Sequence, residues 1–411
     1  MKEKLTSSNS KKNVFALGSV SFFTDLSSEM VLSLLPTFII SLPGSNPAIL
    51  GFIEGIAEAL SYSMRAISGF FSDKIGKRKN LVLGGYALSN IIKPFFGVVN
   101  NAFGALIIRV LDRVGKGIRT SPRDALICDS IPEKNRGVAF GIHRTLDQAG
   151  AIVGPILASI LLIIFGFTAR EVFWFSIIPG LVALVILIFF VKDETCKKQS
   201  EFTFLRGLKN LLKGKFLWLL AIVSIFSLGA FNFSFILLYG SDVGINNQYI
   251  PLLFALVNIA HVAIAIPAGI ISDKIGREKM LFIGYLIFLA VALTIVIEPA
   301  SYFVALIISI MYGLYQGICN TVTRAMIPKY VKPNLVGTAY GIFYLVSGFS
   351  FLLANIIVGS LWNNLGSNLA AVYSLFLTIS SLIGFAIFIK MKKISRKSPN
   401  FFHKENSKYH Q

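Results

Sequence analysis

Long apolar stretches separated by short polar loops fill the chain from residue 14 to residue 390. A helix needs about 20 residues to cross the hydrocarbon layer of a membrane. Twelve stretches come close to this length, so we predict twelve membrane-spanning helices. They cover residues 14–41, 48–70, 81–100, 102–123, 137–166, 172–191, 217–240, 248–271, 281–297, 300–325, 336–361 and 367–390.

One polar loop occurs twice along this pattern. Residues 69–79 read GFFSDKIGKRK, and residues 269–279 read GIISDKIGREK. The same offset relates Gly84 to Gly284 and Gly117 to Gly317. Carriers that work by alternating access are built from such duplicated halves. We therefore predict two pseudo-symmetric six-helix bundles. The predicted parts are bundles at 14–191 and 217–390, a linker at 192–216, and tails at 1–13 and 391–411.

The composition agrees with a membrane protein. The chain is 55% hydrophobic and 14% charged, whereas soluble domains carry about a quarter of charged residues. Its net charge of +19 comes mostly from the two tails and the loops on one side of the predicted spans. This distribution argues against a nucleic-acid binder. By the positive-inside rule it places both termini in the cytoplasm, with the chain in the inner (cytoplasmic) cell membrane.

The repeated loop resembles the loop between the second and third helices of major facilitator superfamily transporters. The resemblance implies this family's fold, an all-α membrane protein. In the family the acid of the loop helps to hold the cytoplasmic side closed, and the second copy departs by having Glu278 where the first has Arg78. The cytoplasmic gate implied here consists of Gly69, Asp73, Gly76, Arg78, Lys79, Asp273 and Arg277.

Two further motifs resemble those of particular members. Residues 113–117 read RVGKG, similar to a fourth-helix pattern whose arginine, here Arg113, is linked to proton transfer in proton-coupled members. Residues 150–155 read GAIVGP and resemble the fifth-helix motif of antiporters, formed here by Gly150, Gly154 and Pro155. The segments FFTDLSSEM (22–30) and DRVGKGIRTSPRD (112–124) resemble a widespread prokaryotic subfamily of carriers, mostly uncharacterised, some similar to drug exporters and some to siderophore carriers.

Ionisable residues inside the spans gather in the first half. Each costs about 2.5–3.5 kcal/mol on insertion scales, so such residues usually serve a function. Asp25 and Glu29 share one face of the first span. A carboxylic acid in a low-dielectric environment can load and release protons near neutral pH. We hypothesise that Asp25 or Glu29 titrates and that Arg113 senses the change. The alternative for each acid is a fixed ion pair between helices.

The second half supplies mainly polar and aromatic residues. We therefore expect a division of labour, in which the first half handles protons and countercharges and the second provides a hydrogen-bonding wall. The first-half stripe that includes Arg109 and Arg113 could clamp carboxylates. The predicted substrate cavity consists of Arg109, Asp112, Arg144, Asp147, Asn232, Asn258, His261, Tyr315, Gln316 and Tyr344.

These features predict a secondary active transporter. The chain lacks a nucleotide-binding loop, so an ion gradient should supply the energy. The motif at 150–155 favours proton-coupled export of a small organic molecule, and the arginine stripe suggests the alternative, proton-driven import of an organic acid or a siderophore. A sensor that does not transport and a membrane enzyme are less favoured, because neither an output domain nor a catalytic constellation is present. We expect a monomer that binds its substrate, protons and lipid, without metal, cofactor or nucleic acid.

Overall fold

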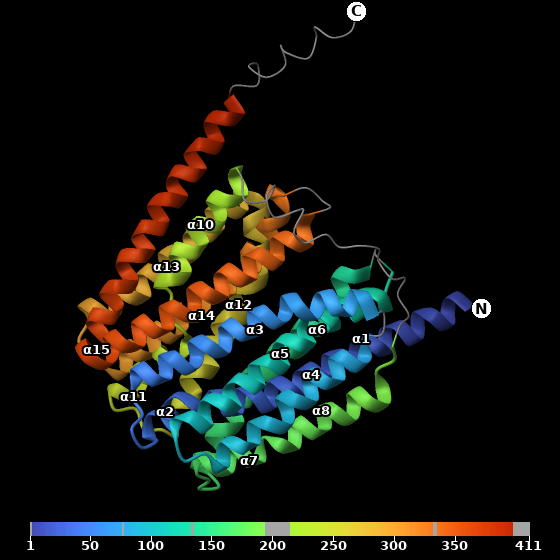
Figure 1. Ribbon diagram of the computed structural model, residues 1–411, viewed down its shortest axis with the longest axis horizontal. Coiled ribbons are helices and arrows are strands. Elements are labelled where there is room, and N and C mark those ends of the chain that lie inside the picture. Colours follow the sequence, from blue (N-terminus) through green and yellow to red (C-terminus); the bar gives the residue numbers. More distant parts are fainter. Residues whose placement is uncertain (1, 76–77, 133–134, 194–213, 332–334, 398–411) are drawn as a thin grey trace, which may run out of the picture.

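The chain folds into helices throughout the part that the computed structural model describes. That part leaves out residues 1, 76–77, 133–134, 194–213, 332–334 and 398–411. In Figure 1 the helices of the first half (blue to green) lie toward the lower right, and those of the second half (yellow-green to red) lie toward the upper left. The protein is thus an all-α membrane protein of two pseudo-symmetric helical bundles. Most of the predicted linker lies outside the described residues, so the domain boundaries stay predictions.

The first bundle follows the first six predicted spans. Its helices are α1 (Lys2–Leu32), α2 (Leu35–Ser41), α3 (Pro47–Ile75), α4 (Lys79–Ile92), η1 (Lys93–Val98), α5 (Ala102–Ser130), α6 (Arg136–Ile163), α7 (Ala169–Phe175) and α8 (Ile177–Phe190). Side-chain caps fix where two of them begin. The Asn101 side chain accepts a 2.8 Å hydrogen bond from the Gly104 amide, and Thr168 forms a capping box with Glu171.

The second bundle repeats this order. Its helices are α10 (Gly214–Gly229), α11 (Phe233–Asp242), α12 (Ile250–Ile275), α13 (Arg277–Ile297), α14 (Tyr302–Met326), η3 (Ile327–Tyr330) and α15 (Val336–Lys397). The last label covers two predicted spans. They meet at Gly366, whose φ of 83° lies in the left-handed region that glycine adopts without a Cβ clash.

The first span of each half is a broken helix. In the first half α1 ends shortly before Pro36, and α2 begins at Leu35. Proline cannot donate a backbone hydrogen bond and its ring crowds the preceding turn, so the helix is interrupted here. In the second half α10 and α11 are separated by residues 230–232, and the Asn232 side chain caps α11 by accepting from the Ser234 amide.

Nine helical segments among the described residues are long and apolar enough to cross a membrane by length and composition. The difference from the twelve predicted spans has two sources. α15 counts once although Gly366 divides it, and α3 and α5 are not among the nine. These two helices carry the acids and bases of the first half, such as Glu54, Glu58 and Arg109, which lower their apolar character.

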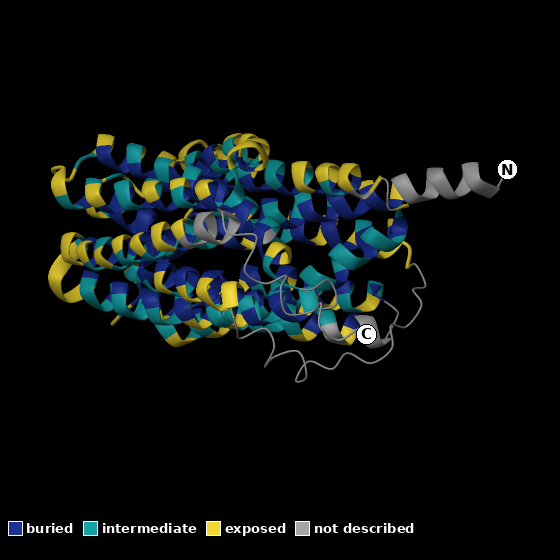
Figure 2. Ribbon diagram, turned by 90° about the horizontal axis from the view of Figure 1, so that it is seen from above, coloured by how far each residue is buried: buried dark blue, intermediate teal, exposed yellow. Residues whose placement is uncertain are grey.

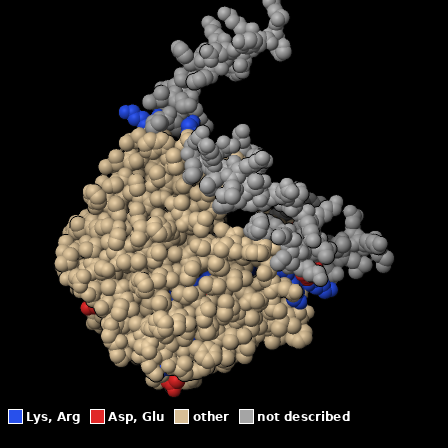
Figure 3. All heavy atoms as spheres, in the orientation of Figure 1, with Lys and Arg blue, Asp and Glu red and all other residues tan. Residues whose placement is uncertain are grey.

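The outer surface is apolar, as a surface that faces lipid must be. In Figure 2 exposed residues follow the outer sides of the helices, and many of them are large hydrophobics, such as Phe189 and Ile266, each 74% exposed. Figure 3 shows a broad face that is almost free of charge, with most of the visible Lys and Arg beside the undescribed residues and a few Asp or Glu atoms at the opposite edges. Soluble monomers rarely expose so much contiguous apolar surface.

The two bundles meet at one end of the molecule, which we call the far end; it contains the loops near residues 44, 100, 166, 244, 300 and 366. The opposite end, which contains the repeated loops and the start of α1, is the termini end (Figure 1). Toward the far end Asn258 donates a 2.8 Å hydrogen bond to the Ala151 carbonyl, and Ser159 donates one of 2.9 Å to Gln248. These bonds join α6 to α12 across the bundle interface.

A second far-end contact joins α3 to α15, and it depends on glycine. A Cβ at Gly359 would lie 2.6 Å from the Pro47 carbonyl oxygen, and one at Gly55 would lie 3.0 Å from that of Leu352. No side chain fits between these backbones. The hydrogen bonds that cross between the bundles at Ser159, Asn232 and Asn258 lie toward the same end. The structure is therefore closed at the far end.

The 200-residue repeat extends to the packing between helices. A Cβ at Gly117 would lie 2.7 Å from the Ser61 carbonyl oxygen, and one at Gly317 would lie 2.5 Å from that of His261. Both glycines let the fourth span of a half approach the second span. Each contact is displaced from its counterpart by the same offset, so the two bundles share one scaffold.

One ion pair is repeated with its charges reversed. Arg78 binds Asp129 at 2.9 Å, and at the equivalent positions Glu278 binds Lys329 at 2.9 Å. Glu278 also accepts a hydrogen bond from the Tyr330 hydroxyl. Burial, together with this acceptor, raises the pKa of the Tyr330 hydroxyl, so Tyr330 stays a donor at physiological pH. Glu278 therefore replaces Arg78 without loss of the bond between the third span and the end of the fourth.

This reversal gives a testable expectation. Lys329→Glu should destabilise the protein by about 1–3 kcal/mol, because it leaves the buried Glu278 carboxylate facing another acid. Combining it with Glu278→Lys should recover most of the loss. Unfolding in mixed detergent micelles measures both effects. If the double variant is no more stable than the single one, the pair does not stabilise the loop.

Candidate functional site

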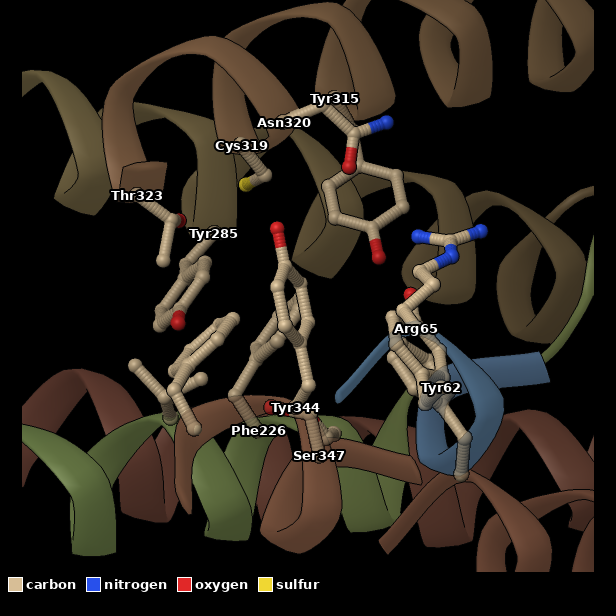
Figure 4. Close-up of a pocket in the computed structure, with 14 residues that line it drawn as sticks. Tyr62, Arg65, Phe226, Tyr285, Tyr315, Cys319, Asn320, Thr323, Tyr344 and Ser347 are labelled. Carbon is tan, nitrogen blue, oxygen red and sulfur yellow. The ribbon is translucent and has the colours of Figure 1, made fainter. Parts of the chain in front are cut away.

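A cavity lies between the bundles, on the termini-end side of the far-end contacts (Figure 4). It holds about 630 Å³ of empty space, its open mouth included. α3 contributes Tyr62 and Arg65 from the first bundle, and α10, α13, α14 and α15 contribute the rest. Ligand sites of membrane carriers lie at such an interface between repeats. Tyr315 and Tyr344, both predicted as cavity residues, line it.

Aromatic rings form most of the cavity wall. Tyr62 stacks on Tyr344 with centroids 5.7 Å apart, and this pair bridges the bundles. On the other side Phe226 stacks on Tyr285 at 3.6 Å, and Tyr315 tilts against Phe226 at 5.7 Å. Such pairs hold flat apolar faces in fixed positions. The wall suits a substrate with a planar, apolar part.

The charged stripe on α5 is largely compensated inside the first bundle. Arg109, fully buried, binds Glu54 of α3 through two hydrogen bonds of 3.0 and 2.7 Å. It also lies 3.4 Å from Asp112, which accepts a 2.6 Å bond from Ser89 of α4. Arg109 and Asp112 thus hold three helices together. Glu54 in turn accepts a 3.4 Å bond from Asn232 across the bundle interface.

A second polar cluster joins α4 to α1. Lys93, almost fully buried, donates to Ser28 at 2.6 Å and to Asn90 at 3.0 Å. Asn90 in turn donates to Thr24 at 3.2 Å. These residues surround the helix that carries the two candidate proton sites.

Glu29 differs from four other acids of the first bundle, Glu54, Glu58, Asp112 and Asp147, which form ion pairs. Its side chain is buried, and its Oε2 has no hydrogen-bond partner among the described residues. Glu58 pairs with Arg113 at 3.3 Å, and Asp147 pairs with Arg144 at 2.8 Å. Asp147 also accepts a 2.8 Å bond from Ser21 and lies next to Asp25. A buried carboxyl group that lacks an ion pair favours its neutral, protonated form.

The glycines of the antiporter-like motif pack directly on this part of α1. A Cβ at Gly154 would lie 2.8 Å from the Leu26 carbonyl oxygen and 3.1 Å from the Cβ of Glu29. Gly150 meets the Phe22 carbonyl even more closely. Pro155, which follows Gly154, is buried inside α6. The motif therefore fixes the distance between α6 and the backbone that carries Glu29.

The remaining second-half predictions lie around the cavity rather than in its wall. Asn258 donates to Ala151 across the interface, and Gln316 donates to the Tyr312 hydroxyl at 3.2 Å. Tyr312 itself donates to the Phe231 carbonyl at 2.9 Å. His261 lies on α12, where its backbone packs against Gly317. The Arg144 side chain is 51% exposed and forms its ion pair with the buried Asp147.

The predicted gate residues lie at the termini end. Besides pairing with Asp129, Arg78 donates its backbone amide to Asp193 at 3.1 Å, and the Lys79 amide does so at 3.2 Å. In the second half Arg277 binds Asp273 at 3.5 Å and donates to the Ala325 carbonyl. Gly69 packs near Ser121. Gly76 and the side chain of Asp73 lie outside the described residues.

Several cavity residues were not predicted from the sequence. Tyr62, Phe226 and Tyr285 are aromatic residues within spans. Such residues occur at lipid-facing positions and at buried positions alike, so the sequence does not distinguish the two. Arg65 was recognisable as an intramembrane charge, but its direction was not. Within the described ranges no cluster of His, Cys, Asp or Glu could hold a metal ion.

Comparisons with known proteins agree with this architecture. The sequence profile of the Major Facilitator Superfamily matches residues 17–239 and 217–408. An uncharacterized MFS-type transporter of Methanocaldococcus jannaschii is 36% identical over 361 residues, which cover 85% of this chain and 88% of the relative. The multi-drug resistance efflux pump PmrA of Streptococcus pneumoniae is 25% identical over 339 residues, or 79% of this chain and 81% of the pump.

Solved structures with the same fold are also transporters. The nucleoside transporter NupG superposes with a TM-score of 0.73 at 14% identity, covering 93% of this chain and 99% of NupG. The peptide transporter POT in complex with sulfate gives 0.75 at 12% identity, with 93% and 94% covered. At these identities the likeness concerns the fold alone. The matches are to membrane transporters and not to enzymes.

Proposed function

Since the chain belongs to the Major Facilitator Superfamily of membrane transporters, we propose that it exports a small organic molecule in exchange for protons. The termini end is the cytoplasmic end in this proposal, and the membrane is the inner cell membrane. The molecule enters the cavity between the bundles, which then rock to open the far end. A proton that enters from outside drives the return.

Glu29 is the observation that carries the proposal. It is a buried acid whose Oε2 has no partner in the described structure, whereas the nearby acids Glu54, Glu58 and Asp112 are paired with arginines. A carboxyl group of this kind can be neutral in one conformation and charged in another, as a coupling site requires. Asp25, beside Asp147, is the second candidate. Arg113 is the charged group on α5 that responds to the protonation of Glu29 or Asp25.

The packing of Gly150 and Gly154 links the candidate proton sites to the position of α6. Both glycines contact the backbone of α1 at the level of Asp25 and Glu29. If protonation changes the position of α1, the contact therefore transmits this movement directly to α6. α6 also forms the far-end contact with α12 through Asn258 and Ser159. This chain of contacts connects the proton site to the closure that faces outward.

Gly51 provides a test of the rocking motion. A Cβ at this position would overlap the Asn355 carbonyl oxygen on α15. Gly51→Val should therefore prevent the far end from closing and hold the protein open on that side. We expect cysteines introduced at the far end to react with impermeant maleimide at least tenfold faster in the variant. Equal reaction rates in both proteins would contradict the proposed closure.

Import of an organic acid or a siderophore is the alternative. Arg109 and Arg113 do not support this alternative as binding groups for a carboxylate substrate, because Glu54 and Glu58 pair with them. The observation in its favour is Arg65, a cation in the cavity wall. Export and import differ in direction, so an oriented flux measurement separates them.

The experiment is a flux screen in proteoliposomes with an imposed pH gradient and a known protein orientation. A suitable panel contains ethidium, naphthalene-2-sulfonate, uridine, a dipeptide and citrate. We expect at least one compound to move from the termini side to the far side against its gradient while protons move the other way. Movement of compound and protons in the same direction would establish import instead. Flux that ignores the pH gradient for every transported compound would overturn proton coupling.

A further inference from the structure

The cavity wall contains one formal charge. Of its 14 lining residues, seven are aromatic, and Arg65 is the one residue of the Asp, Glu, Lys and Arg types. The others are small, amide, hydroxyl, thiol or aliphatic residues, and none is an acid. The cavity is therefore an aromatic chamber with a single positive charge.

Arg65 has no carboxylate partner within the described part of the chain. Five other arginines of the first half, including Arg109 and Arg113, each lie within 4 Å of an acid. The Arg65 Nε is buried and lacks a hydrogen-bond partner there. Glu58 lies two turns away on the same face of α3 and interacts electrostatically with Arg65, but its carboxylate is bound to Arg113. A cation that lacks a carboxylate within ion-pair distance in a low-dielectric chamber attracts an anion.

Its neighbours hold this guanidinium in place. The Cζ of Arg65 lies 4.9 Å from the centre of the Tyr62 ring, a cation–π contact. The Arg65 carbonyl accepts a 2.8 Å hydrogen bond from Ser121 of α5, which fixes the backbone. Figure 4 shows the guanidinium pointing into the chamber beside Tyr62 and toward the ring of Tyr315. The fork of N–H donors is thus presented to a ligand.

The rest of the wall suits a flat ring with few polar groups. Tyr62 and Tyr344 are stacked on one side, and Phe226 and Tyr285 on the other. The hydroxyls of Tyr285, Tyr315 and Tyr344 make no hydrogen bond to a described residue, so they are available to a ligand. A molecule with several negative charges would find only one cation in the chamber, so its other charges would be left without a partner. A cationic molecule would be repelled by Arg65.

We propose that the substrate is a planar aromatic monoanion, whose carboxylate or sulfonate binds Arg65 while its ring lies among Tyr62, Tyr344, Phe226 and Tyr285. This assignment rests on the proposed transport function and adds the substrate class to it. The proposed substrate class excludes polyanions such as citrate, and it excludes lipophilic cations.

The test is ligand binding to the purified full-length protein in detergent, followed by calorimetry. Naphthalene-2-sulfonate is the probe, and naphthalene-2-sulfonamide is its uncharged match in shape. We expect the sulfonate to bind at least tenfold tighter than the sulfonamide, and tighter than cyclohexanesulfonate, citrate or ethidium. Arg65→Gln should remove the preference for the anion and leave sulfonamide binding unchanged, which also shows that the variant is folded. Arg65→Lys should retain part of the preference, and Lys390→Gln, at an exposed position, should retain all of it.

Equal binding of sulfonate and sulfonamide to the unmodified protein would overturn the assignment, as would an Arg65→Gln variant that keeps the anion preference. Because binding is measured without a gradient, it is independent of the transport proposal. Arg65-dependent sulfonate binding without proton-driven flux supports the site and contradicts the proposed export. Proton-driven flux of ethidium without sulfonate binding overturns the substrate class alone.

Discussion

Replacing Glu29 by glutamine is expected to abolish accumulation of substrate against its gradient. Glutamine matches the protonated carboxyl group in shape but cannot release a proton. With one proton exchanged per molecule, a gradient of two pH units supplies about 2.7 kcal/mol, enough for roughly 100-fold accumulation. The variant should accumulate nothing beyond equilibrium. Flux in oriented proteoliposomes with and without the pH gradient measures this.

Substrate exchange at equal pH serves as the internal control, because it needs the cavity but not net proton movement. Glu29→Gln should retain it. Glu298→Gln, at an exposed far-end position, is the matched variant and should behave as the unmodified protein. If Glu29→Gln still accumulates substrate, the coupling site lies elsewhere, and Asp25→Asn and Arg113→Ala become the decisive variants. Retention of gradient dependence by all three would exclude the assignment.

The second large effect concerns stability. Glu54→Ala should destabilise the protein by about 3–5 kcal/mol, because it leaves the guanidinium of Arg109 charged and fully buried. Combining Glu54→Leu with Arg109→Met replaces both partners by apolar groups of similar size. This double variant should recover part of the stability, since a well-packed apolar pair often equals a buried ion pair, whereas Asp112 loses its contact with Arg109. Unfolding in mixed detergent micelles gives the free energies.

Arg144→Ala is the comparison for this result. Arg144 forms an ion pair with Asp147, but its side chain is 51% exposed. Exposed pairs contribute up to about 1 kcal/mol, so the loss should be small. A Glu54→Ala variant that unfolds within about 1 kcal/mol of the unmodified protein would show that Glu54 and Arg109 do not hold α3 and α5 together.

The sequence predicted the scaffold well, since the length of apolar runs and the side on which Lys and Arg lie are read along the chain. The break at residues 100–101 and the division at Gly366 fall where the apolar pattern stops. The pairing of Glu54 with Arg109 could not be predicted from the sequence, because the two positions are 55 residues apart and are brought together by helix packing. The spacing of Arg109, Asp112 and Arg113 gave their common face but not their partners.

The residues of the aromatic chamber are the part of the site that the sequence predicts least well. A tyrosine such as Tyr285 has the same sequence surroundings as one that faces lipid, and only the rotation of its helix distinguishes the two. The 200-residue repeat carries one further signal. Adding 200 to the pair Arg78 and Asp129 gives Glu278 and Lys329, and the reversed charges alone predict a second ion pair. Duplicated chains can be searched in this way for paired positions.

The central claim is that protonation of Glu29 drives the exchange between the two arrangements of the bundles. The most direct measurement is the distance between spin labels at Val138 and Lys274, which are exposed positions at the termini end of each bundle. The native cysteines Cys128, Cys196 and Cys319 are replaced first. The account predicts two distance populations whose ratio changes with pH in the parent protein. It predicts that Glu29→Gln stays, at every pH, at the ratio that the parent shows at low pH. A ratio in the parent that does not depend on pH, or the same pH dependence in Glu29→Gln, would contradict it.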